Sequence, residues 1–212
     1  MASDSPIAFI KQTIKDFRNT GALAPSSVFL ARAMAECLPK DIPDDFRLIE
    51  VGPGTGSITG ELIRRMNGHG HLDLWEISPE FCAVLRKRIA EDKLFKALTG
   101  RIHVHDGDVR KLKTTVRYDA VVSGLPLNNF EPHEVAGFLE HFRELLKPTG
   151  VLVWFEYIAI RKLQTPFVGK VKRQRLEGVG AVVEKFVRAH HSKKKTIPIN
   201  LPPARVWQLT FK

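Results

Sequence analysis

A glycine-rich turn after a short apolar run carries the strongest chemical signal in this sequence. Residues 50–56 read Glu-Val-Gly-Pro-Gly-Thr-Gly, with glycines at alternate positions. Glycine lets the backbone turn tightly and approach a ligand closely, and a turn that opens a helix presents backbone N–H groups to that ligand. The pattern is G-x-G-x-G rather than G-x-G-x-x-G, so it does not indicate a site for a dinucleotide pyrophosphate.

An acidic residue further along the chain strengthens this signal. Glu76 lies 24 residues after Gly52, at the end of the next predicted strand. A carboxylate in that position can accept hydrogen bonds from both ribose hydroxyls of a nucleoside-bearing cofactor. The alternative is a loop glycine cluster with a chance acid nearby. The combination of turn, strand end and spacing favours the cofactor site.

The elements that must position these residues alternate along the chain. We predict five strands, at 47–51, 71–76, 101–105, 118–123 and 151–157. We predict helices at 6–19, 26–38, 57–66, 79–92 and 132–146, with Ser78 as the N-cap of the fourth. This alternation predicts a parallel sheet covered by helices on both faces. The segments 179–189 and 205–211 are predicted as a final antiparallel pair, because no helix-length segment separates them.

Composition and charge narrow the class of protein. The 212 residues predict one domain, and the two cysteines, Cys37 and Cys82, predict neither a disulfide framework nor a cysteine zinc site. Eight histidines show no ligand spacing, so we expect no metal. No apolar run is long enough to span a bilayer, and the N-terminus lacks the pattern of a secretory signal, which predicts a cytoplasmic protein. A nucleophile elbow and a phosphate-binding P-loop are both missing from the sequence, which gives hydrolase and ATPase functions no support.

The positive charge is concentrated near the end of the chain. Residues 161–212 hold 13 basic and 2 acidic side chains, a net +11, whereas residues 1–160 hold 20 basic and 21 acidic ones, a net −1. Clusters occur at 170–175 and 193–195. This asymmetry predicts a polyanionic partner, either nucleic acid or an anionic membrane, although a solvated basic face would look similar.

The glycine turn, Glu76 and the antiparallel final strands resemble the seven-stranded S-adenosylmethionine-dependent methyltransferases over about residues 45–211. The resemblance implies an α/β, Rossmann-like class I fold with a mostly parallel sheet, an antiparallel last strand and two extra N-terminal helices. It implies S-adenosylmethionine as cofactor and S-adenosylhomocysteine as product. It also implies a set of cofactor-binding residues: Glu50, Gly52, Pro53, Gly54, Thr55, Gly56, Glu76, Ile77, Gly107, Asp108, Val109 and Ser123. Asp108 is the expected acceptor for the adenine amine, and a helix N-cap role is compatible with that.

The fourth predicted strand ends in Ser-Gly-Leu-Pro-Leu-Asn-Asn-Phe, residues 123–130, where this superfamily meets its acceptor. Adenine methyltransferases carry Asn or Asp before a proline turn and an aromatic ring after it, whereas Ser123 and Leu127 stand here. The first four residues of this segment, Ser-Gly-Leu-Pro at 123–126, resemble the bacterial phospholipid N-methyltransferases, which are soluble relatives of the ribosomal RNA adenine dimethylases. Segments 21–27, 30–34 and 202–206 resemble that family as well.

This second resemblance implies methyl transfer to the amino group of phosphatidylethanolamine and its mono- and dimethylated intermediates, toward phosphatidylcholine. The expected catalytic residues are Ser123, Gly124, Leu125, Pro126 and Tyr157. Backbone carbonyls at 124–125 would orient the amine, and the ring of Tyr157 would face the methylated cation. Glu156 and Tyr157 are candidate neighbours of the amine. The sequence does not name the base that removes its proton.

A lipid substrate also predicts a way to reach a membrane. The 6–19 helix places Ile7, Ile10, Ile14 and Phe17 on one face with basic residues beside them, so it can lie in an anionic membrane interface or pack into a core. The basic segment 161–176 can contact the same surface. We therefore expect helices over 1–44 that bind membrane and cover the cofactor, a methyltransferase domain over 45–212, and a monomer on the inner face of the cytoplasmic membrane.

One alternative function is an RNA or DNA adenine methyltransferase, which would use the basic C-terminal segment to bind phosphates. Leu127 and the lack of a separate C-terminal RNA-binding domain argue against it, so we expect no nucleic-acid partner. A non-catalytic binding protein on the same scaffold is a third alternative, and the intact glycine turn and Glu76 disfavour it.

Overall fold

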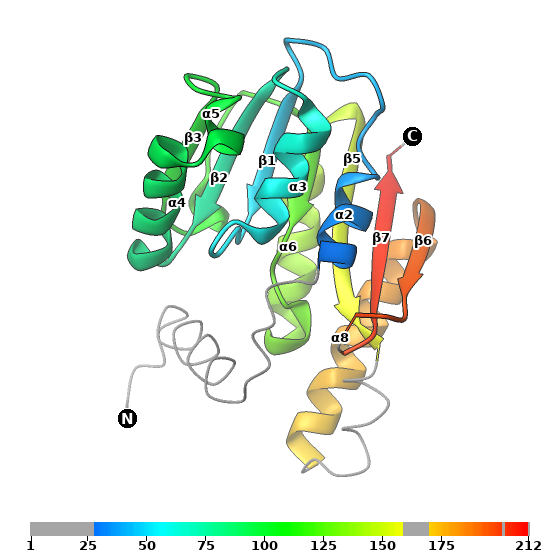
Figure 1. The fold of residues 1–212 in the computed structure, drawn as a ribbon. Coiled ribbons are helices and arrows are strands. Elements are labelled where there is room, and N and C mark those ends of the chain that lie inside the picture. The colour runs from blue at the N-terminus through cyan, green and yellow to red at the C-terminus, as the bar shows by residue number, and fades with distance from the viewer. Residues whose placement is uncertain (1–27, 159–169, 201, 212) are drawn as a thin grey trace.

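A seven-stranded sheet with helices on both faces forms the fold of the computed structural model, which describes residues 28–158, 170–200 and 202–211 (Figure 1). The strands lie in the order β3-β2-β1-β4-β5-β7-β6. Their bounds are β1 Arg47–Val51, β2 His71–Glu76, β3 Ile102–Asp106, β4 Tyr118–Ser123, β5 Leu146–Tyr157, β6 His191–Ile197 and β7 Ala204–Thr210. The pairs from β3 to β5 are parallel, and β7 is antiparallel to both β5 and β6. The predicted fold class is confirmed.

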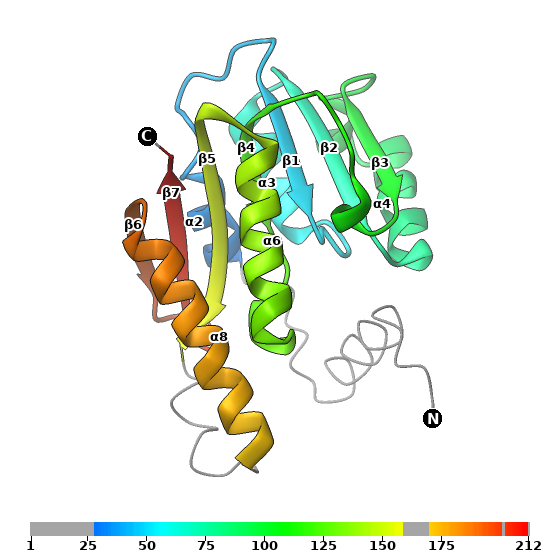
Figure 2. The ribbon, with the colours of Figure 1, turned by 180° about the vertical axis from the view of Figure 1, so that it is seen from behind.

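Two layers of helices cover the sheet. On one face lie α2 Val28–Ala35, α3 Ser57–Met66, α4 Pro79–Glu91 and the short α5 Lys93–Lys96. On the other lie α6 Pro132–Leu145 and α8 Lys170–Arg188, which pack side by side in Figure 2, with the 3₁₀ turns η1 Val109–Lys111 and η2 Leu127–Asn129 nearby. Each face of the sheet has its own cluster of buried apolar side chains.

Several predicted boundaries agree with the structure. The strands β1, β2 and β4 and the helix α3 have the predicted bounds. The predicted cap of α4 is also confirmed, because the Ser78 hydroxyl accepts a hydrogen bond from the Phe81 N–H at 3.4 Å. The predicted strand at 101–105 lies one residue further on, and β5 begins at Leu146 rather than Val151.

The prediction of a strand at 179–189 is wrong, because residues 179–188 form the second half of α8. Leu176, Val179, Val183 and Phe186 are buried and recur at helical spacing against the α6 side of the sheet. The missing strand is β6, in the segment expected to be a connection. Most side chains of β6 are exposed, so its sequence lacks the alternation that signals a half-buried strand.

The N-terminal elements are described only in part. The predicted 6–19 helix lies outside the described residues, and so do the segments 1–27 and 159–169. The second predicted helix is present as α2, whose Leu30 and Met34 are fully buried in the same apolar cluster as α3. In the described ranges, no helix is both long and apolar enough to cross a membrane.

Candidate functional site

The candidate site lies where β1, β2, β4 and β5 end. The chain passes from β1 to β2 and β3 on one side, and the connection from β3 then returns to β4 on the other side of β1, so the strand order reverses at β1. A crevice at the carboxyl ends of the strands is expected at such a switch point. The register places Val51 beside Ser123 and Glu76 beside Asp106. The ends of these strands therefore bring the predicted cofactor and acceptor residues to one edge of the sheet.

The cofactor turn and the acceptor turn touch through their backbones. Gly52, Gly54 and Gly56 have φ angles of 70°, 58° and 84°, a region that side-chain-bearing residues rarely adopt. A Cβ on Gly124 would lie 2.6 Å from the Gly52 carbonyl oxygen, and one on Gly52 would lie 2.7 Å from Leu125. Among the described residues, apart from its two chain neighbours, no heavy atom lies within 4 Å of a Cβ built on Gly54, so this part of the structure leaves the tip of the turn open.

The remaining residues of the turn fix its shape. The carbonyl of Pro53 accepts the Gly56 N–H at 2.9 Å, and the Thr55 carbonyl accepts Arg88 Nη1 at 2.8 Å. Gly52 itself donates its N–H to the Trp75 carbonyl of β2. The predicted motif is therefore a rigid backbone cradle that begins at the end of β1.

Glu50 is a fully buried carboxyl group directly before this cradle. Neither of its carboxyl oxygens has a hydrogen-bond partner in the described structure. The pKa of Glu50 is raised to about 8, mainly by burial and also by the negative charge of the nearby Glu76, while the adjacent polar groups of Thr59 offset part of the rise. A buried carboxyl with unused hydrogen-bonding capacity beside an open glycine turn fits the cationic amino group of a ligand.

Glu76 is held at the end of β2 by two backbone N–H groups. Its Oε2 accepts from Gly54 at 3.0 Å and its Oε1 accepts from Ser78 at 2.9 Å. Burial raises its pKa, whereas the hydrogen bonds from Ser78, Gly54 and Ile77 lower it. A carboxylate accepts about four hydrogen bonds, so both oxygens keep capacity for ribose hydroxyls.

The residues after β3 are partly engaged with the protein itself. Gly107 donates its N–H to the Glu76 carbonyl, which joins the β2 and β3 ends. Asp108 caps η1 and forms hydrogen bonds through both oxygens with the Arg110 guanidinium, the shortest at 2.6 Å. Burial raises the pKa of Asp108, but the bonds from Arg110 outweigh this and lower it overall. Val109 is buried in the α6-side cluster. Binding of adenine by Asp108 stays a prediction.

The acceptor turn and the end of β5 line a small, open pocket. Its lining residues are Pro126, Leu127, Asn128, Asn129, Phe155, Glu156 and Tyr157. Ser123 is fully buried, and its hydroxyl accepts the Leu125 N–H at 3.3 Å, which fixes the start of the turn. Tyr157 packs edge-on against Phe155, and burial raises the pKa of its hydroxyl, so it stays protonated near neutral pH.

Glu156, which the sequence named as a candidate neighbour of the amine, is held by two residues that sequence reasoning did not select, Arg205 and Trp207. Glu156 is buried, and its Oε1 accepts hydrogen bonds from Arg205 Nη1 and from Trp207 Nε1, each at 3.1 Å. The sequence offers no direct signal for this contact, because it depends on the register between β5 and β7. That register places Arg205 opposite Glu156.

The structure describes only some of the basic residues that the sequence predicts to contact a membrane. Arg161 and Lys162 lie outside the described residues, and the side chains of 170–172 are not described. Arg175 lies 3.9 Å from Glu131, the N-cap residue of α6.

Among the histidines, His69 contacts Asp44 and His105 contacts Asp73. Within the described ranges there is no cluster of three or more side chains suited to a metal ion.

Comparison with known proteins agrees with this geometry. Residues 48–150 match the family described as "Methyltransferase domain". This stretch is therefore similar to a methyltransferase domain, and the fold is the one that solved methyltransferases share. The matched residues contain the glycine turn, Glu76, Asp108 and the acceptor turn. Two solved structures with this fold hold S-adenosylmethionine or S-adenosylhomocysteine. The open glycine turn, the buried Glu50 and the capacity of Glu76 all fit this group.

Two curated proteins similar to this chain act on different kinds of acceptor by name. An "Ornithine lipid N-methyltransferase" of Singulisphaera acidiphila is 28% identical over 148 residues, which cover 67% of this chain and 72% of that protein. A "Ribosomal RNA small subunit methyltransferase A" of Synechococcus sp. is 29% identical over 106 residues, which cover 50% of this chain and 34% of that protein.

Solved structures share the fold at low sequence identity. The O-methyltransferase TomG of Streptomyces achromogenes, solved with S-adenosylmethionine, has a TM-score of 0.64 at 14% identity, and the match covers 100% of this chain and 92% of that one. The glycopeptide N-methyltransferase MtfA, solved with S-adenosylhomocysteine, has a TM-score of 0.66 at 14% identity, covering 90% and 89%.

Proposed function

We propose that this protein transfers a methyl group from S-adenosylmethionine to the amino group of a membrane lipid, with phosphatidylethanolamine and its methylated intermediates as the expected acceptors. The burial of the acceptor turn carries this proposal. Leu127 and Phe130 are 4% and 5% exposed, and both pack into the α6-side cluster. The turn therefore offers no exposed aromatic ring on which an extruded base would stack, as adenine methylation requires.

The chain's own groups act mainly by positioning. The bound cofactor supplies a methyl group on a positively charged sulfur. The backbone of Gly124 and Leu125 lies against the cofactor turn, so an amine oriented there would lie close to the bound cofactor. Holding two reactants in line supplies most of the rate enhancement for such a displacement. The amine loses a proton in the reaction, and the protonated Tyr157 hydroxyl is not suited to accept it.

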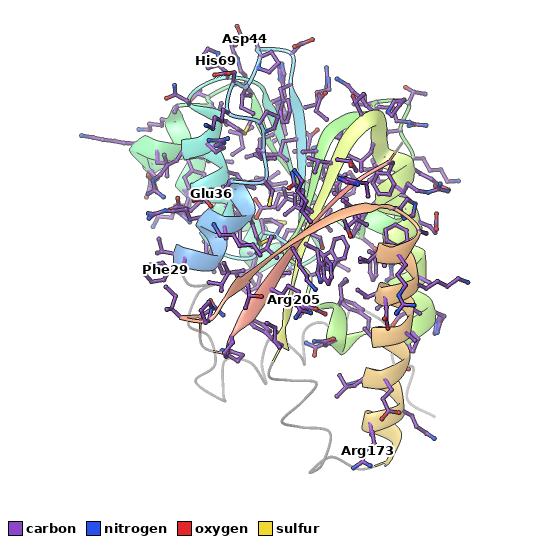
Figure 3. All side chains as sticks on the ribbon, turned by 90° about the vertical axis from the view of Figure 1, so that its right-hand side faces the viewer. Phe29, Glu36, Asp44, His69, Arg173 and Arg205 are labelled. Carbon is purple, nitrogen blue, oxygen red and sulfur yellow. The ribbon has the colours of Figure 1, made fainter. Side chains whose placement is uncertain are left out.

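Exposed apolar side chains at the same edge support access to a lipid surface. Val28 and Phe29 are 57% and 53% exposed at the start of α2, and Ile199 is 60% exposed in the turn between β6 and β7. α2 packs against both strands, and Figure 3 shows Phe29 at the end of α2 nearer that turn. Ala204 after the turn pairs with Tyr157, so the turn adjoins the acceptor pocket.

A basic residue of α8 near this edge favours an anionic partner. Arg173, exposed near the start of α8, lies at the lower end of the molecule in Figure 3. Apolar side chains next to basic ones favour an anionic phospholipid surface, because each basic side chain there contributes about 1 kcal/mol. We propose that this edge binds the inner face of the cytoplasmic membrane, together with the 6–19 helix and the basic segment 161–176.

The test is transfer of a labelled methyl group from S-adenosylmethionine to anionic vesicles that contain phosphatidylethanolamine or ornithine lipid. A ribosomal RNA fragment serves as the competing acceptor. We expect label in the phosphatidylethanolamine vesicles and none in the RNA. Label in ornithine lipid alone would keep the lipid amine and change the lipid, and label in RNA alone would overturn the proposal.

An adenine acceptor in RNA is the second candidate, and one surface favours it. Lys193, Lys194 and Lys195 are exposed on the edge strand β6, where they could contact phosphates. The similarity to a ribosomal RNA methyltransferase points the same way. Lysines are also common on edge strands because they prevent pairing with other chains, so this surface does not select RNA over lipid.

A further inference from the structure

We propose that Glu156, held by Arg205 and Trp207, is a binding subsite for the ammonium group of the acceptor. The inference rests on the proposed function, since it assigns to one carboxylate the recognition of the amine that is to be methylated. It goes beyond cofactor binding, because the residues involved lie on β5 and β7 rather than on the glycine turn.

The composition of the acceptor pocket is the first observation. Of the described residues that line it, Glu156 alone carries a charge, and the others are apolar, aromatic or amide side chains. Glu156 is 8% exposed. A carboxylate that is largely shielded from water interacts more strongly with a nearby cation than an exposed carboxylate does.

The second observation is how the carboxylate is held. Arg205 and Trp207 both donate to Oε1 at 3.1 Å, and both come from β7, the antiparallel neighbour of β5. A carboxylate accepts about four hydrogen bonds, so the bonds from Arg205 and Trp207 do not by themselves fill the accepting capacity of Glu156. The two donors stabilise the ionised carboxylate and fix its direction, which makes Arg205 and Trp207 positioning residues.

The arrangement of charge around the pocket is the third observation. Arg205 neutralises Glu156 from behind but is not among the pocket-lining residues, so a ligand in the pocket meets the acidic member of the pair. Figure 3 shows Arg205 on the lower part of the sheet, near the end of β5. The guanidinium of Arg205 and the ammonium of Lys194 both lie over the ring of Trp207, 5.6 and 5.8 Å from its centroid.

The aromatic residues of the pocket extend this recognition to methylated amines. Phe155 and Tyr157 flank Glu156 on β5, and both line the pocket. An ammonium that has gained methyl groups loses hydrogen-bond donors but keeps its charge, and aromatic rings bind such cations well. The subsite is therefore suited to a primary ammonium and also to its methylated successors, which an enzyme that adds several methyl groups must rebind.

The decisive variant is Glu156→Gln, which removes the charge and keeps an acceptor for Arg205 and Trp207. With phosphatidylethanolamine vesicles as substrate, we expect the variant to have a lipid KM about tenfold or more above that of the wild type. Its affinity for S-adenosylmethionine should differ from wild type by less than about twofold. The matched control is Glu184→Gln, which removes an exposed carboxylate paired with Arg188 on α8 and should leave both values unchanged. An unchanged lipid KM in Glu156→Gln would overturn the subsite.

The positioning role is tested by Trp207→Phe, which keeps a ring and deletes one donor. We expect a raised lipid KM with kcat changed much less, and little further effect when Trp207→Phe is added to Glu156→Gln, because the two changes act through the same group. If the increases in lipid KM caused by the two single changes instead multiply in the double variant, Trp207 acts by another route and its assignment to the subsite is wrong.

A binding measurement separates the subsite from the proposed reaction. With S-adenosylhomocysteine bound, wild-type protein should bind glycerophosphocholine more tightly than glycerol phosphate, which lacks the ammonium, and Glu156→Gln should abolish the difference. Equal binding of the two probes by wild type would refute the subsite even if lipid is methylated. A preference for the cationic probe in an enzyme that methylates only RNA would keep the subsite and refute the lipid function.

Discussion

The buried carboxyl of Glu50 makes folding stability depend on pH in a way that Glu50→Gln should remove. Burial raises the pKa of Glu50 from 4.5 to about 8. Between these values the folded protein keeps a proton that the unfolded chain has released. Raising the pH through this range therefore favours unfolding, and the loss of stability is complete above about pH 8.

The size of the effect follows from the two pKa values. One pKa unit corresponds to about 1.4 kcal/mol, so the full difference amounts to about 5 kcal/mol, and roughly 3 kcal/mol is already lost at about pH 7. Gln has no proton to lose and is nearly the same shape. Its buried amide adds a cost of about 1–3 kcal/mol that does not change with pH. The difference in slope between the two proteins therefore isolates Glu50.

The measurement is urea unfolding of both proteins, without ligand, between about pH 5 and pH 9. Glu76, whose pKa is also raised by burial, contributes to both curves, so its own burial effect largely cancels in their difference. We expect the stability of Glu50→Gln relative to wild type to increase steadily up to about pH 8. A constant difference would mean that Glu50 is already ionised in the folded protein.

Ligand binding provides an independent check on the same carboxyl. If the amino group of the cofactor's methionine half pairs with Glu50, binding should ionise the carboxyl and release a proton near neutral pH. Calorimetry of S-adenosylhomocysteine binding in buffers with different ionisation enthalpies measures that release. Wild type should release a fraction of a proton that Glu50→Gln does not. Equal release by both proteins would remove Glu50 from the methionine end of the site.

Three further substitutions test the remaining parts of the site. Glu76→Ala should weaken S-adenosylmethionine binding by about 1.5–3 kcal/mol, measured by calorimetry, with the fold retained. Gly124→Ala should destabilise the protein by about 1–3 kcal/mol and reduce cofactor affinity, because the added Cβ would meet the Gly52 carbonyl. The control is Gly137→Ala, on the open surface of a helix, which should not destabilise the protein. Phe29→Ser should reduce co-sedimentation with anionic vesicles, whereas Val84→Ser, another exposed apolar position, should have no effect.

The sequence predicts the position of the glycine turn and Glu76 better than the contacts around the acceptor pocket, for physical reasons. Glu50, the glycines and Glu76 follow from local turn chemistry at strand ends, which is visible in a short segment. The strand error at 179–189 arises because β-branched valines and two glycines dominate a helix that is stabilised by packing. Gly178, for example, lies so close to Pro132 that a Cβ would come within 2.7 Å of the proline ring. Arg205 and Trp207 escape prediction because strand register brings them to Glu156.

The reversed direction of β7 has a consequence for how this scaffold can diversify. Because β7 runs against β5, its first residues, rather than its last, lie beside the end of β5. The side chains that hold Glu156 therefore come from just after the β6–β7 hairpin, whereas the cofactor cradle is built from β1 and β2 on the other side of β4. Sequence change in the hairpin can thus alter acceptor choice while the methyl-donor apparatus stays intact, so the two halves of one enzyme can evolve at different rates.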